Sequence, residues 1–140
     1  MNQISQAYKE LLGENEFVYL DIGARGGPSK QLKKLFEDNV IKLILVELKE
    51  TESSELKKKF IVWDKPLWKE SADKEIYLTK NKSYSSLLSP NEKVLEGTFY
   101  YDRNFYKIEK IVKTKTTTIN DMLNENKEII SQIDFMKIDI

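Results

Sequence analysis

The chain has 140 residues, with 23 basic and 23 acidic side chains, no histidine and no cysteine. Its length is that of one ordinary domain, and its 40% hydrophobic and 33% charged residues are typical of a soluble globular protein. The absent residue types exclude disulfides, thiolate nucleophiles, imidazole bases and metal sites built on Cys or His, so we expect no metal and look for acids and bases among Asp, Glu, Lys and Tyr.

Charge and hydropathy restrict the expected partners. A formal net charge of zero argues against electrostatic binding of nucleic acid, and only Arg25 and Arg103 could make forked contacts with phosphate or guanine. No apolar run approaches the roughly 20 residues that span a bilayer, and the amino terminus does not resemble a signal peptide. We therefore expect no nucleic-acid partner, no membrane association and a cytoplasmic location.

Residues 1–15 are predicted to form an amphipathic helix. Apolar side chains recur there every three or four positions, and Gly13 follows as a carboxyl-terminal cap. We expect this apolar face to pack on a sheet or on a partner. Its members are Ile4, Ala7, Tyr8, Leu11 and Leu12.

Residues 16–68 are predicted to form a βαβαβ unit. The runs 17–23 and 41–47 are almost continuously apolar, which is typical of parallel strands buried on both faces. A glycine-rich turn and a helix that begins near Pro28 and ends at Asn39 connect them. A short helix at 52–59 and an apolar strand at 61–63 complete the second crossover.

Residues 69–117 are predicted to form an insertion with antiparallel character, because a strand at 75–79 and an extended stretch at 107–117 flank a turn-rich loop. In residues 118–140, Thr118 caps a short helix and 133–140 has the pattern of another buried strand. The predicted fold class is therefore α/β, a Rossmann-like sheet with helices on both faces and an antiparallel insertion.

The strongest chemical motif lies between the first strand and its helix. Asp21 is followed by Gly23 and Gly26, and Glu47 ends the next strand. Ligands of open α/β sheets bind outside the carboxyl ends of the strands, where glycines let a ligand approach the backbone. Glu47 lies about 20 residues beyond the glycines, the spacing at which an acid meets ribose hydroxyls. A structural alternative, in which the glycines only permit a tight turn, stays open.

The turn distinguishes between nucleoside ligands. A dinucleotide fingerprint has G-x-G-x-x-G, whereas this turn has G-x-x-G-G, which disfavours a nicotinamide-dependent oxidoreductase. Asp21 would oppose a phosphate but suits an ammonium group. S-adenosylmethionine carries an ammonium, a carboxylate and a ribose, which match the acid, the glycine turn and the second acid in order.

Several motifs occur in one order along nearly the whole chain: YLDIGARGG, LILVEL, PLW, EIYLT, SYSSLLSPN, TKTTTINDML and IDFMKIDI. In them the sequence resembles the FkbM-type family of S-adenosylmethionine-dependent methyltransferases. The resemblance implies a class I methyltransferase fold with S-adenosyl-L-methionine as cofactor. It also implies O-methylation of a hydroxyl on a sugar, a glycan or a secondary metabolite.

The resemblance implies roles for individual cofactor-binding residues. Glu47 would hold the ribose hydroxyls, and Leu67 would lie near the adenine. The residues expected to line the methionine end are Asp21, Gly23, Ala24 and Gly26. Arg25, where the family commonly has Asn, would reach the cofactor carboxylate or an acidic substrate group, or would point into solvent.

Three further residues carry alternatives. Ser85 and Ser86 match a Ser-Ser-Leu element of the family, and either a hydrogen-bonded turn or a substrate contact explains them. Asp139 would orient or deprotonate the acceptor hydroxyl. Alternatively, Asp139 is an acid at a strand end that lacks a partner.

In the FkbM-type family the IDFMKIDI strand continues into further strands and helices. We therefore expect this chain to be the N-terminal part of one incomplete methyltransferase domain, truncated after the fourth core strand and inactive alone. The alternative is a non-catalytic Rossmann-like module that associates through its exposed sheet edge. Under either hypothesis the last strand is an edge with unpaired backbone groups, which predicts self-association.

Overall fold

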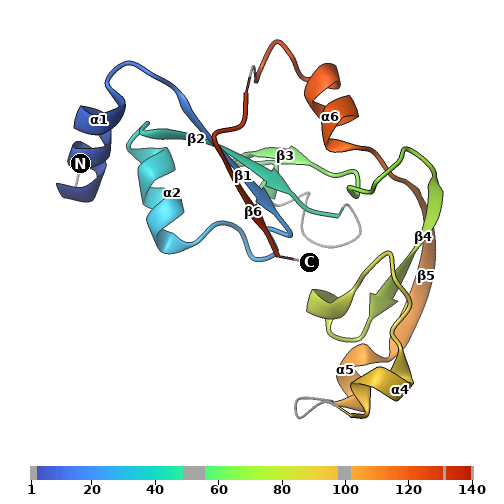
Figure 1. The fold of residues 1–140 in the computed structure, drawn as a ribbon. Helices are drawn as coiled ribbons and strands as arrows, with labels where there is room; N and C mark the ends of the chain where they lie inside the picture. The colour runs from blue at the N-terminus through green and yellow to red at the C-terminus, as the bar shows by residue number, and fades with distance from the viewer. Residues whose placement is uncertain (1–2, 49–55, 98–101, 131, 140) are drawn as a thin grey trace. The chain divides into compact units, whose positions relative to one another are not determined.

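The computed structural model of the chain describes residues 3–48, 56–97, 102–130 and 132–139. The chain forms two compact units, shown in Figure 1. Unit 1 comprises Met1–Pro66 and Ile119–Ile140, and unit 2 comprises Leu67–Thr118. The expected insertion at 69–117 lies within unit 2.

Unit 1 contains a four-stranded parallel sheet in the order β3-β2-β1-β6. The chain passes from β1 outward to β3 and then returns to the other side of β1, so the order reverses at β1. This order is compatible with a Rossmann-like fold and places a topological switch point between β1 and β6. The strands are β1 (Phe17–Ile22), β2 (Ile41–Val46), β3 (Ile61–Trp63) and β6 (Phe135–Ile138).

The two central strands are buried on both faces, as their apolar runs predict. In β2, the consecutive residues Leu43, Ile44 and Leu45 are all 0% exposed. Successive side chains of a strand point to opposite faces, so both faces of the sheet are covered at β2. Leu35 and Phe36 of α2 (Lys30–Glu37) contribute to the apolar clusters on one of these faces.

Helix α2 begins later than predicted. It starts at Lys30 rather than near Pro28, because Ser29 is the N-cap and its Oγ accepts a hydrogen bond from the Leu32 N–H at 3.3 Å. The helix ends as predicted, with Asn39 in the left-handed region at φ 54°. The first half of the predicted helix at 52–59 lies outside the described residues, and in the second half Leu56 is helical and 57–59 form a turn.

Helix α1 (Gln3–Leu12) and its cap at Gly13, with φ 62°, confirm the first predicted element. Its apolar face packs only in part, however, because Leu12 contacts the core cluster of Leu35, Val40 and Ile41 while other members are exposed. Leu11 is 82% exposed and Ile4 58% exposed, whereas Ser5 is fully buried. With 10 residues, α1 is the longest of the described helices, and none of them is long and apolar enough to cross a bilayer.

Strand β6 differs from the buried strand predicted at 133–140. It has four residues, and Phe135 and Ile138 are 51% and 58% exposed. The physical reason is its position, because β6 lies at the edge of the described sheet and pairs there only with β1. The preceding helix, α6 (Ile119–Glu125), forms as predicted and buries Met122.

Unit 2 contains a two-stranded antiparallel sheet, which confirms the antiparallel character predicted for this part of the chain. Ile76 is 0% exposed and Leu78 is 5% exposed, so this alternating pair forms the buried face of the first strand. The elements of unit 2 are β4 (Asp73–Thr79), η1 (Lys82–Tyr84), α4 (Glu92–Leu95), α5 (Arg103–Tyr106) and β5 (Ile108–Lys115).

Candidate functional site

The carboxyl ends of β1, β2 and β6 form one edge of the parallel sheet, which we call the carboxyl edge. The Gly23 N–H donates to the Val46 carbonyl at 3.0 Å, and the Asp139 N–H donates to the Ile22 carbonyl at 3.0 Å. Gly23, Glu47 and Asp139 therefore follow three adjacent strands at nearly the same level. Since neighbouring strands lie about 4.8 Å apart, Glu47 and Asp139 flank the glycine turn on its two sides.

The glycine turn after β1 depends on its glycines. A hydrogen bond from the Gly27 N–H to the Ala24 carbonyl, 2.8 Å long, closes a four-residue turn with Gly26 at its third position. Gly26 has φ 75°, which is the conformation that a type II turn requires there. A Cβ added to Gly26 would meet no atom within 4 Å, so the backbone is open to approach at this point.

Ala24 and Arg25 sit inside this turn in different surroundings. The Ala24 methyl group is 2% exposed and lies in a core cluster with Leu43 and Leu45. The Ala24 N–H donates to the Val46 carbonyl at 3.3 Å, so its amide helps to hold the turn against the end of β2. Arg25 is half-buried, and its Nη1 atom is buried rather than extended into solvent.

Glu47 is a buried acid at the carboxyl edge. It is only 7% exposed, and its N–H donates to the Trp63 carbonyl of β3 at 3.1 Å. Its Oε1 accepts a hydrogen bond from the Leu48 N–H at 3.0 Å. A buried carboxylate needs hydrogen-bond donors around it, and the Leu48 N–H is one of them.

Asp21 forms an ion pair with Lys137, a residue that the sequence motifs did not indicate. Lys137 of β6 stands directly opposite Asp21 of β1 in the strand register, and its Nζ donates to Asp21 Oδ1 at 2.8 Å. The hydrogen bond that Lys137 donates to Asp21 is the main cause that raises the pKa of Lys137 above its ordinary value. The sequence feature that could have indicated Lys137 is that it is a lysine inside the otherwise apolar FMKI run.

Asp139 lies beside the same ammonium group. Its Oδ2 is 3.6 Å from Lys137 Nζ, and its side chain is 76% exposed. Asp21, Lys137 and Asp139 therefore form a row of alternating charge across β1 and β6, buried at Asp21 and open to solvent at Asp139.

The remaining predicted residues belong to unit 2. Leu67 is half-buried and forms a bridge with Thr117. Ser85 Oγ accepts a hydrogen bond from the Thr79 N–H at 3.1 Å, and Ser86 Oγ accepts one from the Leu88 N–H at 3.1 Å. Both hydroxyl oxygens thus stabilise the loop that follows β4.

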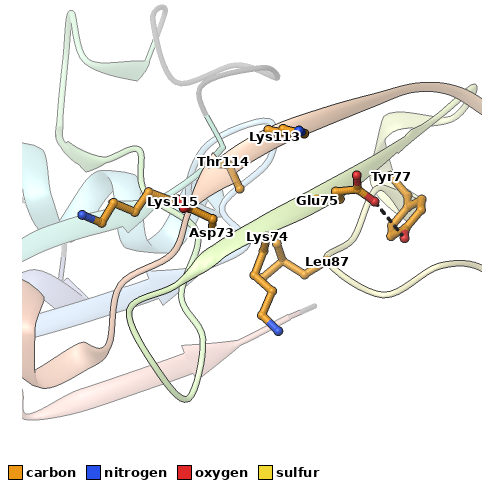
Figure 2. A pocket seen from close by; sticks show the side chains of 8 residues that line it. All are labelled: Asp73, Lys74, Glu75, Tyr77, Leu87, Lys113, Thr114 and Lys115. Atoms are coloured by element: carbon orange, nitrogen blue, oxygen red, sulfur yellow. Dashed lines mark hydrogen bonds between the residues drawn. The ribbon is translucent and has the colours of Figure 1, made fainter.

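A hollow of about 840 Å³ lies over β4 and β5 of unit 2, and none of the predicted site residues lines it. Opposite charges face each other across its strands, since Asp73 is paired in register with Lys115 and Glu75 with Lys113. Figure 2 shows its side chains spread along the strands rather than converging, with the Tyr77 hydroxyl donating to Glu75 Oε2 at 3.5 Å. This balanced pattern is typical of a solvated sheet face.

The carboxyl edge combines an open glycine turn, a buried acid and a lysine between two further acids. This set suits a ligand that has a neutral diol at one end and both charges of an amino acid at the other. No protein-family model matches the sequence, and no curated protein or solved structure matches it.

Proposed function

We propose that the chain binds S-adenosylmethionine at the carboxyl edge and serves a methyltransferase of the FkbM type. The transferred methyl group would go to a hydroxyl of a sugar, a glycan or a secondary metabolite. One observation carries this proposal: the strand order places Glu47 and Asp139 on the two sides of the glycine turn, at the switch point of the sheet.

The residues at this edge fit the cofactor. The buried Glu47 carboxylate can accept hydrogen bonds from two ribose hydroxyls, and the open backbone at Gly26 permits close approach. The Lys137 ammonium, held by Asp21, offers a positive charge to the amino-acid end. A pyrophosphate fits less well, because Asp21, Glu47 and Asp139 surround the turn with negative charge.

The proposed methyl transfer depends mainly on the alignment of the acceptor hydroxyl with the methyl group. S-adenosylmethionine, when bound, would supply a methyl carbon on a sulfonium; the acceptor oxygen would bond to this carbon in line while the carbon–sulfur bond breaks and S-adenosylhomocysteine leaves. Such a displacement gains most of its rate from proximity and orientation, so the absence of histidine is no obstacle. Asp139, whose side chain is 76% exposed, can accept a hydrogen bond from the acceptor hydroxyl and take its proton.

Calorimetric titration with S-adenosylhomocysteine tests the binding step. Glu47→Ala should raise the dissociation constant at least about tenfold, because the ribose hydroxyls lose a charged acceptor. Glu128→Ala, an exposed acid in unit 1, is the matched control and should bind like the unaltered chain. The proposal is wrong if the unaltered chain gives no heat of binding, or if Glu47→Ala binds equally well.

A second candidate function is association without catalysis. The observation that favours it is the outer edge of β6, where Phe135 and Ile138 are 51% and 58% exposed. An exposed strand edge offers unpaired backbone groups to a second strand. Self-association without any binding of S-adenosylhomocysteine would favour this function over methyl transfer.

A further inference from the structure

The ion pair across β1 and β6 has one buried and one accessible member. The Asp21 side chain is 4% exposed, whereas the Lys137 side chain is 40% exposed. A ligand that approaches the carboxyl edge from solvent therefore meets the Lys137 ammonium before it meets the Asp21 carboxylate.

Asp21 holds this ammonium in a fixed place. A buried carboxylate without a cation is costly, and the 2.8 Å hydrogen bond from Lys137 Nζ compensates its charge. The strand register fixes both backbones, because Asp21 and Lys137 are direct neighbours in the parallel pair. The pKa of Lys137 is raised, chiefly by this hydrogen bond, so the group is a cation at neutral pH.

The ammonium has donors for a ligand as well. A lysine has three N–H donors, and Lys137 uses one of them for Asp21. Asp139 Oδ2 lies 3.6 Å from Lys137 Nζ, which is beyond ordinary hydrogen-bond length. The two flanking acids leave the row with a net charge of about −1, which disfavours a doubly charged phosphate. They favour instead a carboxylate that belongs to a zwitterion, since its ammonium group offsets the neighbouring acids.

Building on the proposed function, we propose that Lys137 binds the carboxylate at the amino-acid end of the ligand, and that Asp21 is the positioning residue that holds its ammonium. Asp21 thereby acts at the methionine end through Lys137 rather than by direct contact with the ligand's ammonium.

The test compares two ligands by calorimetry on the full chain. S-adenosylhomocysteine carries the amino-acid end, and 5′-methylthioadenosine has the same nucleoside and thioether without it. For Lys137→Met we expect a dissociation constant about tenfold higher for S-adenosylhomocysteine and a change below about twofold for 5′-methylthioadenosine, because one charge-assisted hydrogen bond is lost. Lys127→Met, an exposed lysine of unit 1, is the control and should alter neither ligand.

Each outcome decides between a ligand contact and a structural role. Equal weakening of both ligands, or unchanged binding of S-adenosylhomocysteine, overturns the inference while the proposed function stands. Failure of the unaltered chain to bind S-adenosylhomocysteine overturns the proposed function and this inference with it. If circular dichroism shows that Lys137→Met is unfolded, the double variant Asp21→Asn with Lys137→Met replaces it, since it leaves no buried charge unpaired, and the same ligand-specific loss is expected.

Discussion

The carboxylate of Asp38 is held by a lysine of the preceding helix in unit 1. It follows α2, its side chain is 10% exposed, and Lys34 Nζ donates to its Oδ1 at 2.7 Å. The hydrogen bond from Lys34 is the main cause that lowers the pKa of Asp38 to about 2. The ionised form of this residue is therefore tied to the folded state.

This coupling predicts an acid-dependent loss of stability. The pKa of Asp38 is 3.8 ordinarily and about 2 in the folded chain. Its contribution to the free energy of unfolding is therefore complete above pH 3.8 and is lost as the pH falls through about 2. Asp38→Asn should lower the free energy of unfolding at neutral pH, and the difference should vanish near the lower value. Urea unfolding measures it, with the neighbouring exposed Glu37→Gln as control, and a pH-independent difference would contradict the assignment.

At the residue scale, local pattern located some members of the site and not others. Asp21 and Glu47 could be placed from the sequence, because an acid that ends an apolar run marks the carboxyl end of a strand. Lys137 could not, since its partner lies 116 positions away and their contact depends on the register of β1 with β6. The buried state of Ala24 depends likewise on packing against β2.

At the element scale, β2 is the most deeply buried element of unit 1, whereas most of the apolar face of α1 is exposed. Burial of a leucine side chain stabilises a core by roughly 1.5–3 kcal/mol, and the cavity left by its removal adds to the loss. The same substitution should therefore have different effects in the two elements.

Leu43→Ala should lower the free energy of unfolding by about 2–5 kcal/mol, because its side chain is 0% exposed in the core cluster around Ala24. Leu11→Ala, at 82% exposure on α1, should change it by less than about 0.5 kcal/mol. Denaturant unfolding of both variants measures the contrast. Equal losses would mean that the exposed face of α1 is packed in solution.

The elements show what periodicity determines. Apolar runs predicted β1, β2 and β3, and the repeat of three and four predicted α1 and α2. Periodicity did not predict the start of α2, which depends on the Ser29 side chain as N-cap. Periodicity also could not show that most of the apolar face of α1 is exposed or that β6 is half exposed, since both depend on which neighbours cover an element.

At the scale of the whole molecule, we propose that copies of the chain associate through the edge strand β6. We expect light scattering to give a mass above the 16.5 kDa of one chain. Ile138→Lys should restore the monomer, because a charge on an edge strand opposes pairing with a second strand. Ile111→Lys on β5, at similar exposure, is the control and should leave the association unchanged. A monomeric unaltered chain would contradict this prediction.

The most direct test of the proposed site is a titration of the ¹⁵N-labelled chain with S-adenosylhomocysteine, followed by its amide chemical shifts. We predict saturable shifts at the carboxyl edge, in the amides of Gly23, Gly26, Leu48 and Asp139. Amides beside the hollow of unit 2, such as those of Tyr77 and Lys113, should stay in place. Absence of shifts, or shifts gathered around that hollow, would contradict the assignment of the carboxyl edge as the cofactor site.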